Sequence, residues 1–293
     1  MKESTLPTRI ELAPGLRDLA ELGGGSFEAW MGLNEGLATA DRAQGLFSIP
    51  GESLLRLPLP GTPDEHGMRR ERPSGAGTGW VRVHRFAGRG AELLRARLTH
   101  PRSSSLAARE WNLICHLQRN GVGAPRLIAL GERPGVLTSR SFLVTRELEG
   151  FEPLDAWLAR RPQGRERRLG LRALGIAFAA LFRCGAWLPG LALGDVHLSR
   201  APLARGPEPG ECAASVLEEL QASSRVVRGL RLRRVPLPSV AFTGFRRGRI
   251  LPRVSRRRRV ALLEALGGEA RDAFTRMECA RILALALESR RVG

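Results

Sequence analysis

Two side chains with acid–base or metal-binding capacity lie in one short stretch of the chain. Residues 183–200 read RCGAWLPGLALGDVHLSR and contain one carboxylate, Asp195, and one imidazole, His197. The stretch follows a long apolar segment, residues 168–184, that predicts a buried helix. A carboxylate in such a place could deprotonate a hydroxyl group or ligate Mg²⁺.

Glycine and arginine mark two further segments that could meet phosphate. Residues 75–79 read GAGTG, and Gly77 and Gly79 would let backbone N–H groups approach a phosphate. A plain hairpin turn is the alternative. The segment 246–259 carries eight arginines. It is either the solvated start of a helix or a surface for an acidic substrate or an anionic membrane face.

Hydrophobic periodicity predicts the elements that must position these residues. The predicted strands are residues 54–59, 80–86, 125–131, 141–148 and 240–245, and the predicted helices are residues 106–120, 154–160, 168–184, 216–229, 260–266 and 271–288. Serine is expected to cap the helix that starts at Leu106. The order of elements predicts an α+β fold with a small sheet-plus-helix lobe and a larger, mainly helical lobe.

The predicted organisation has three parts. Residues 1–49 are an N-terminal lead-in, residues 50–150 form the small nucleotide lobe, and residues 151–293 form the helical lobe. The helical lobe contains a catalytic-loop-like segment, 188–198, and the basic segment 246–259.

The net charge and the aromatic content indicate which classes of molecule the chain could bind. The 293 residues are 43% apolar and carry a formal charge of +18, nearly all from arginine, because Lys2 is the only lysine. This charge suits phosphate, nucleic acid or anionic lipid. Aromatic residues make up only 5% and tyrosine is absent, which argues against stacking on nucleic-acid bases.

Cysteine usage and hydropathy predict the compartment. The four cysteines form no CxxC pair, which favours a reduced cytoplasmic protein without disulfides or a zinc site. The N-terminus lacks the apolar core of a signal peptide, and no apolar run approaches the roughly 18 residues of a membrane span. Any membrane contact is therefore expected to be peripheral.

Four segments resemble the lipopolysaccharide kinases of the Kdo/WaaP family, which are bacterial enzymes with a protein-kinase-like fold. They read SSSLAAREWNLICHLQRNGVGAPRLIALGE, SFLVTRELEGFEPLDAWL, ALFRCGAWLPGL and VAFTGFRRGRILPRVSRRRRVALLEAL. The resemblance covers most of residues 50–290. It implies a bilobal kinase-like fold that transfers phosphate from ATP, with Mg²⁺, to a sugar hydroxyl of the lipopolysaccharide core or another anionic glycolipid. It also implies a cytoplasmic location, peripheral at the inner membrane.

The resemblance assigns a role to each candidate position. In the family pattern a strand lysine contacts the phosphates and pairs with a helix glutamate; His84 stands at the lysine position and Glu110 at the glutamate position. A surface carboxylate near a helix start is the alternative for Glu110. Gly190 stands where the catalytic base belongs, and Gly244 stands where a metal-binding aspartate belongs.

Asp195 is the acid that survives in this pattern. It follows Gly190 by five residues, where kinases commonly carry a metal-binding side chain, so it could ligate Mg²⁺. The sequence GDVH around it also resembles the G-D-x-H motif of aminoglycoside-type phosphotransferases, which would make Asp195 the base. Arg82 or Arg85 could reach the phosphate in place of the missing lysine.

The substitutions at His84, Gly190 and Gly244 predict a weakly active or inactive pseudokinase, because loss of several catalytic groups costs orders of magnitude in rate. Such a module would use ATP and Mg²⁺ only if active and otherwise no cofactor. The alternative is an active ATP-dependent phosphotransferase that uses Asp195. A third interpretation, a basic nucleic-acid-binding protein, rests on charge alone. The residues leave open whether the chain is an enzyme.

Overall fold

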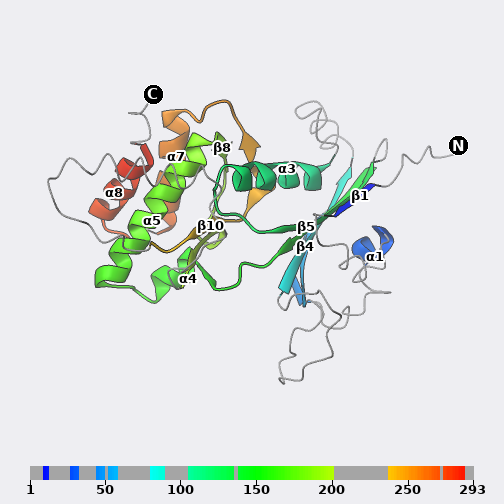
Figure 1. Ribbon diagram of the computed structural model, residues 1–293, viewed down its shortest axis with the longest axis horizontal. Coiled ribbons are helices and arrows are strands. Elements are labelled where there is room, and N and C mark those ends of the chain that lie inside the picture. Colours follow the sequence, from blue (N-terminus) through cyan, green and yellow to red (C-terminus); the bar gives the residue numbers. More distant parts are fainter. Residues whose placement is uncertain are drawn as a thin grey trace, which may run out of the picture. The chain divides into compact units, whose positions relative to one another are not determined.

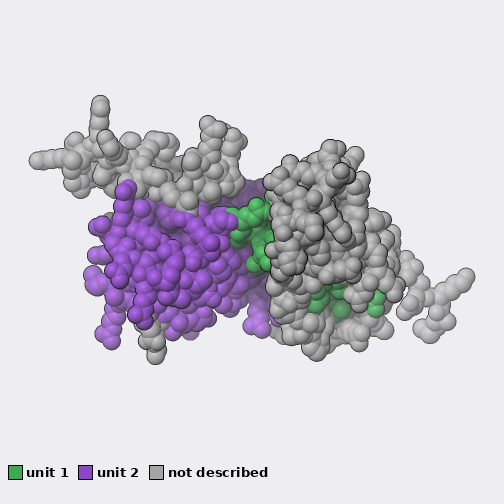
Figure 2. Space-filling view, turned by 90° about the horizontal axis from the view of Figure 1, so that it is seen from below, with its two compact units in different colours: residues 1–112, 125–149 green, residues 113–124, 150–293 purple. Residues whose placement is uncertain are grey.

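The computed structural model describes residues 9–12, 27–32, 44–49, 52–58, 80–89, 105–134, 138–200, 237–270 and 273–287. The glycine-rich run with Gly77 and Gly79, and the predicted helix 216–229, lie outside these ranges. The chain divides into two compact units (Figure 2), unit 1 with residues 1–112 and 125–149, and unit 2 with residues 113–124 and 150–293. None of the described helices is long and apolar enough to cross a lipid bilayer.

Unit 1 is built on a six-stranded antiparallel sheet (Figure 1) with strand order β1-β5-β6-β4-β3-β2. The strands are β1 (Arg9–Leu12), β2 (Gln44–Ile49), β3 (Glu52–Pro58), β4 (Trp80–Arg89), β5 (Leu127–Pro134) and β6 (Thr138–Arg146). The strands β3 to β6 confirm the four predicted in this part of the chain. The sequence alone does not predict β1 or β2.

The two faces of this sheet differ because side chains alternate along β4. Val81 and Val83 lie in an apolar cluster with Phe142 and with Phe27 and Trp30 of helix α1 (Phe27–Gly32). The side chains between them in sequence lie on the opposite face. The sheet therefore buries one apolar face and leaves polar residues of β4 on the other.

Helix α3 (Leu106–Arg119) starts in unit 1 and carries the predicted serine cap. Ser105 Oγ accepts a hydrogen bond from the Ala108 backbone N–H at 3.1 Å and donates one to Glu132 Oε1 of β5 at 2.5 Å. The cap therefore fixes the start of α3 against the sheet of its own unit.

Unit 2 combines helices with two small sheets. Its helices are α4 (Leu154–Ala159), α5 (Gly164–Arg183), α7 (Arg256–Glu269) and α8 (Arg276–Leu287). One sheet has the order β10-β9-β7, and the other pairs β8 with β11. These strands are β7 (Phe151–Pro153), β8 (Ala186–Trp187), β9 (Val196–Ser199), β10 (Val240–Phe242) and β11 (Arg249–Ile250). The predicted α+β fold class is confirmed.

Two helices of unit 2 begin at residues that the apolar pattern does not mark. Helix α7 starts at Arg256 and not at Val260, because Ser255 Oγ accepts from the Arg258 N–H at 3.4 Å. Helix α8 starts at Arg276 and not at Arg271. Thr275 and Glu278 form a reciprocal capping box there, with Glu278 Oε2 accepting from the Thr275 N–H at 2.9 Å.

Strand β10 is shorter than predicted and ends at Phe242. Gly244 then takes a left-handed conformation with φ +71°, and the short 3₁₀ helix η5 (Phe245–Arg247) follows. The chain therefore turns sharply just after the strand that the family resemblance links to metal binding.

Candidate functional site

The structure brings His84 and Glu110 together in unit 1. His84 Nδ1 of β4 lies 3.3 Å from Glu110 Oε2 of α3. Both side chains are largely shielded, with exposed fractions of 17% and 7%. The surface carboxylate considered for Glu110 is therefore wrong. The pair occupies the positions where the family pattern has lysine and glutamate, and its role toward a nucleotide stays a prediction.

One oxygen of the Glu110 carboxylate stays unsatisfied in this pair. Glu110 Oε1 is buried and has no hydrogen-bond partner among the described residues. A lysine ammonium has three donors, whereas Nδ1 of a histidine offers at most one proton. The Glu110 carboxylate thus lies in an environment that a larger cationic donor would complete.

An ion-pair cluster that the sequence does not reveal lies further along β3 and β4. Glu147 accepts hydrogen bonds from Arg56 Nε at 2.8 Å and from Arg82 Nη2 at 3.3 Å. Arg56 and Arg82 are directly opposite each other in the sheet, and the Arg56 guanidinium lies 4.1 Å from the centre of the Trp80 ring. Arg82, considered above as a phosphate ligand, is therefore paired with a carboxylate.

Arg85 occupies a different setting from His84. It follows Val81 and Val83 in the alternation of β4, which directs it to the face with the apolar cluster. Burial lowers the pKa of Arg85 to about 10. The structure thus does not bring Arg85 to the face that carries the His84–Glu110 pair.

Asp195 is held firmly in unit 2, at the end of the 3₁₀ helix η3 (Leu193–Asp195). Its Oδ2 accepts from the Ala192 N–H at 3.1 Å, and its Oδ1 accepts from Thr243 Oγ1 at 3.4 Å. His197 is buried, and its Nε2 lies 3.2 Å from Thr243 Oγ1. The acid and the imidazole of the stretch 183–200 thus meet the same threonine.

Gly190 lies exposed in a turn with φ +77°. A Cβ built there would have no heavy atom within 4 Å. The structure therefore has room for a side chain at this position, and the backbone conformation is one that asparagine and aspartate tolerate better than most residues.

Gly244 is different, although it too has a positive φ, +71°. A Cβ built there would lie 2.4 Å from Asp195 Cγ and 2.4 Å from Asp195 Oδ2. These separations are far below van der Waals contact. Asp195 therefore fills the space into which any side chain at 244 would project.

The described residues test whether Mg²⁺ fits this region. No group of three or more His, Cys, Asp or Glu side chains in the described ranges could hold a metal ion on its own. Mg²⁺ is commonly bound through one or two carboxylates together with substrate phosphates. Asp195, which fills the Cβ space of Gly244, fits a cation carried by a phosphate ligand. It does not by itself make an all-protein metal site.

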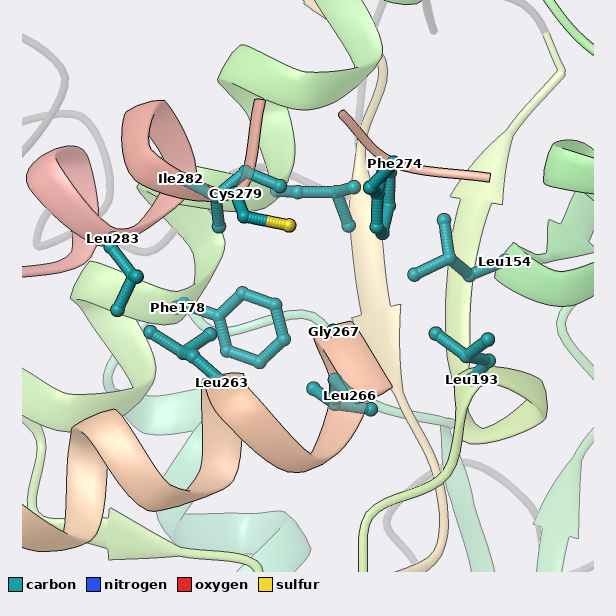
Figure 3. Close-up of a pocket in the computed structure, with 11 residues that line it drawn as sticks. Leu154, Phe178, Leu193, Leu263, Leu266, Gly267, Phe274, Cys279, Ile282 and Leu283 are labelled. Atoms are coloured by element: carbon teal, nitrogen blue, oxygen red, sulfur yellow. The ribbon is translucent and has the colours of Figure 1, made fainter. Parts of the chain in front are cut away.

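An apolar pocket lies elsewhere in unit 2 (Figure 3). It is lined by side chains of α5, α7 and α8 and by Leu154 and Leu193, and Figure 3 shows Phe178, Leu263 and Cys279 around it. Its volume is about 40 Å³, which is too small for a nucleotide or a sugar. The pocket is therefore not the candidate site for a nucleotide or a sugar.

A comparison with protein families gives one match for this chain. The model of the family described as lipopolysaccharide kinase (Kdo/WaaP) matches residues 64–187. This stretch of the chain is similar to that family, in agreement with the resemblance seen in the sequence. The matched residues include His84 and Glu110 and end before Gly190, Asp195 and Gly244.

The comparison with solved structures bears on the fold of this chain. The structure titled "WaaP in complex with acyl carrier protein" matches with a TM-score of 0.58 and 18% identity, over 96% of this chain and 89% of that one. The expected kinase-like fold is therefore confirmed.

Two further results complete the comparisons. A match to the "bifunctional kinase-methyltransferase WbdD" has a TM-score of 0.33 and 15% identity, over 73% of this chain and 41% of that one, which is too low to argue from. The comparison with curated proteins gave no match.

Proposed function

We propose that this chain is a pseudokinase of the lipopolysaccharide kinase family, with the kinase-like fold retained and phosphoryl transfer lost or very slow. The observation that carries this proposal is the exposed turn at Gly190. Nothing lies within 4 Å of a Cβ built there, so no described side chain takes the place of the missing base. Transfer to a sugar hydroxyl needs a carboxylate in hydrogen-bond reach of that hydroxyl.

Asp195 is the alternative candidate for the role of base, and its surroundings favour a different role. Its Oδ2 already accepts a hydrogen bond from the Ala192 N–H, and its Oδ1 accepts one from Thr243 Oγ1. These bonds tie the carboxylate to its own turn and to the side chain of the first residue after β10. A base must instead approach the acceptor hydroxyl and take its proton, so the active phosphotransferase built on Asp195 is the second candidate.

ATP and Mg²⁺ are the ligands that the similarity to this kinase family suggests. The His84–Glu110 pair supports a phosphate contact, because a protonated imidazole can replace the lysine cation in charge though not in reach. We propose that nucleotide binding, if retained, is weaker than in relatives with the lysine. The orphaned Glu110 Oε1 supports this, since the carboxylate is only half paired.

A phosphate-transfer assay tests the proposed function directly. Full-length protein is incubated with γ-labelled ATP, Mg²⁺ and a purified lipopolysaccharide core acceptor, beside a Gly190→Asp variant. We expect no transfer above background from the unaltered chain. Turnover at roughly 1–100 s⁻¹, the usual range of kinases, would overturn the proposal. A gain of transfer in Gly190→Asp would show that only the base is missing.

The surface of this chain best suited to an anionic ligand lies in unit 2. We call it the basic face, and it consists of Arg247, Arg249, Arg253, Arg256, Arg257 and Arg258. These arginines are exposed, and none forms an ion pair with a described residue. The segment from 245 to 263 contains no acid. Arginines at the start of α7 also oppose the helix dipole, so a bound anion would relieve an unfavourable charge arrangement.

Arg259 does not belong to this basic face, although it continues the same run. It is only 7% exposed. Its Nε donates to the Val254 carbonyl at 2.9 Å, and its guanidinium lies 5.7 Å from the centre of the Phe182 ring. The exposed part of the arginine run at the start of α7 therefore ends at Arg258, and the proposed basic face excludes Arg259.

Ile250 indicates which anionic partner suits the basic face. It is 47% exposed, one of two large apolar side chains so exposed among the described residues, and it follows Arg249 directly. Cationic residues around an exposed apolar side chain are typical of peripheral membrane contact. We therefore propose that the chain acts at the anionic inner membrane or on its phosphorylated glycolipids, from the cytoplasmic side.

An acidic protein is the alternative to the anionic membrane as the partner of the basic face. One structural relative is WaaP in complex with acyl carrier protein. A pull-down with acyl carrier protein beside vesicle sedimentation separates the two. If the chain binds acyl carrier protein and not anionic vesicles, its partner is a protein and not the membrane. If it binds nucleic acid in preference to either, nucleic acid is the partner.

A further inference from the structure

Three arginines share the face of the unit 1 sheet that carries the apolar cluster and α1. Arg133 of β5 and Arg140 of β6 are directly opposite each other in the antiparallel register. Arg85 of β4 is opposite Phe142, so Arg85 and Arg140 are diagonal neighbours on the same face. Long side chains at such positions are within reach of one another, and like charges placed this way destabilise a sheet unless an anion neutralises them.

The acids of the neighbouring strands do not neutralise this group. The described strands β3, β4, β5 and β6 contain two acidic residues, Glu52 and Glu132. Their positions in the register are opposite Phe86 and Ser141, and these positions belong to the other face of the sheet. Glu132 accordingly accepts its hydrogen bond from Ser105 at the start of α3. The α1 face thus receives no carboxylate from these four strands.

Arg85 has an unused pair of hydrogen-bond donors. Its Nε and Nη2 are shielded from solvent and have no hydrogen-bond partner among the described residues. These two nitrogens form one edge of the guanidinium, and the parallel N–H groups of that edge fit two oxygens of a carboxylate or phosphate. Burial lowers the pKa of Arg85 to about 10, so the side chain is still charged at neutral pH. A shielded donor without an acceptor is unfavourable, and an oxyanion at this edge would relieve that cost.

The neighbours of Arg85 would add to the binding of such an anion. Phe142 does not cover Arg85, although the two are opposite in the sheet. A Cβ built at Gly131 of β5 would lie 2.1 Å from Phe142 Cε1, so the ring leans over β5 and away from β4. Ser53 of β3 is opposite Arg85 on its other side and brings a hydroxyl group to the same face. An oxyanion beside Arg85 would therefore have Ser53 and Arg140 as neighbouring donors.

We infer that Arg85, Arg140 and Ser53 form a binding site for a phosphate group on the α1 face of the sheet, with Arg133 at its edge. Phosphate suits this site better than a carboxylate, because it brings about two negative charges and three oxygens to several donors. The site is on the opposite face of β4 from His84, so it is separate from the expected nucleotide site and independent of the proposed function. The phosphate belongs to a soluble molecule or to a lipid headgroup, and both sources present the same chemistry.

The competing explanation is that Arg85 has only a structural role. In that case its replacement by methionine, which is also long and unbranched, should lower the thermal midpoint with and without phosphate. An arginine that serves a ligand instead leaves the free protein with a shielded and unpaired charge. Arg85→Met should then leave the midpoint of the phosphate-free protein equal or higher and remove its response to phosphate.

Thermal shift of the full chain at constant ionic strength tests the inference, with inorganic phosphate or glycerol 3-phosphate against chloride. An anion that binds only the folded chain raises the midpoint. We expect Arg85→Gln to weaken phosphate binding at least about tenfold, which is the loss of one hydrogen bond between charged groups. Arg126→Gln is the matched control, because Arg126 is an exposed arginine just before β5 in the same unit. It should respond as the unaltered chain does.

A variant without part of the basic face separates the two sources of phosphate. Replacement of Arg256, Arg257 and Arg258 by Gln should leave the response to soluble phosphate unchanged, because these residues are in unit 2. In this variant, Arg85-dependent binding to vesicles with phosphatidic acid, tighter than to glycerol 3-phosphate, would assign the phosphate to a lipid headgroup. Tighter Arg85-dependent binding of glycerol 3-phosphate would assign it to a soluble molecule.

Three results would overturn the inference. The first is a midpoint of the unaltered chain that phosphate does not raise. The second is an equal phosphate response in Arg85→Gln, with circular dichroism showing that the variant is folded. The third is a response that is lost in His84→Gln and kept in Arg85→Gln, because the phosphate would then bind on the other face of β4.

Discussion

His84 and Glu110 form a pair in which only one of the two carboxylate oxygens is matched. His84 Nδ1 lies 3.3 Å from Oε2, whereas Oε1 is buried without a hydrogen-bond partner among the described residues. A buried acceptor without a partner costs about 1–3 kcal/mol. The kinase-like lobe therefore carries a local cost at the place where its relatives are expected to hold phosphate.

His84→Lys should remove part of that cost. The ammonium group has three donors and can meet both oxygens of Glu110, so we expect the thermal midpoint to rise or stay equal and ATP affinity to increase. His84→Gln is the control, because it offers hydrogen bonds without charge. If both variants lower the thermal midpoint equally, a lysine at position 84 does not satisfy the unpaired oxygen of Glu110.

The elements that position this pair could be predicted because their signals are local. Strand β4 alternates apolar and polar residues, and α3 has an apolar stripe after a serine, so both follow from periodicity. The pairing itself came from the family resemblance, because no local pattern links residue 84 to residue 110. Strands β1 and β2 escaped prediction because they are short and owe their stability to distant partners, such as β5 for β1.

The relation between Asp195 and Gly244 could not be predicted for the same reason. It depends on the antiparallel register of β9 and β10, which pairs Phe242 with Val196 across more than 40 intervening residues. From the sequence, Gly244 is interpreted as a lost metal ligand and Asp195 as a retained acid in a separate motif. The register shows that they compete for one space.

Substitution of the two glycines by aspartate should destabilise the protein to very different extents. Gly190→Asp enters open space and should cost only about 1 kcal/mol for the left-handed backbone. Gly244→Asp meets the Asp195 carboxyl and should be strongly destabilising, beyond the roughly 1–3 kcal/mol of an overpacked site, since two like charges are also forced together. Urea denaturation measures both.

The matching alanine variants separate the side chain from the backbone. Gly190→Ala should resemble Gly190→Asp, whereas Gly244→Ala should already be destabilising because its Cβ alone meets Asp195. Equal stability of Gly190→Ala and Gly244→Ala would contradict the steric exclusion described here.

The ion pair between Arg167 and Glu278 should make the stability of unit 2 fall in acid. Arg167 Nε donates to Glu278 Oε1 at 2.5 Å and Nη2 donates to Oε2 at 2.8 Å, which joins α5 to α8. The hydrogen bonds from Arg167 lower the pKa of Glu278 to about 2, against the opposing effect of burial. The stabilisation is thus complete above about pH 4.3, the pKa of an unfolded glutamate, and is lost as the pH falls toward about 2.

Glu278→Gln should remove this part of the acid sensitivity. We expect the variant to be less stable at neutral pH by about 1.5–3 kcal/mol, the usual contribution of a hydrogen bond to a charged group, with a smaller further loss between pH 4.5 and pH 2. Urea titrations at several pH values measure this, with Glu264→Gln as the control for an exposed carboxylate. A parallel pH profile in Glu278→Gln and the unaltered chain would show that the pair does not matter.

Substitutions in the basic face should weaken membrane binding without lowering stability, whereas substitution of Arg259 should lower stability. Replacing Arg256, Arg257 and Arg258 together by Gln should weaken binding to anionic vesicles roughly 100-fold, given about 1 kcal/mol for each arginine near such a surface. The thermal midpoint should not fall, because these side chains are exposed, form no ion pairs with described residues and oppose the dipole of α7.

Arg259→Gln should do the reverse. It removes a buried guanidinium that bonds the Val254 carbonyl and lies over Phe182, so the thermal midpoint should drop while vesicle binding by the folded fraction stays close to normal. Ile250→Ser tests the apolar part of the contact and should weaken binding even at high salt, where arginine contacts are screened. Vesicle binding that depends on Arg259 and not on the three preceding arginines would contradict the assignment of the basic face.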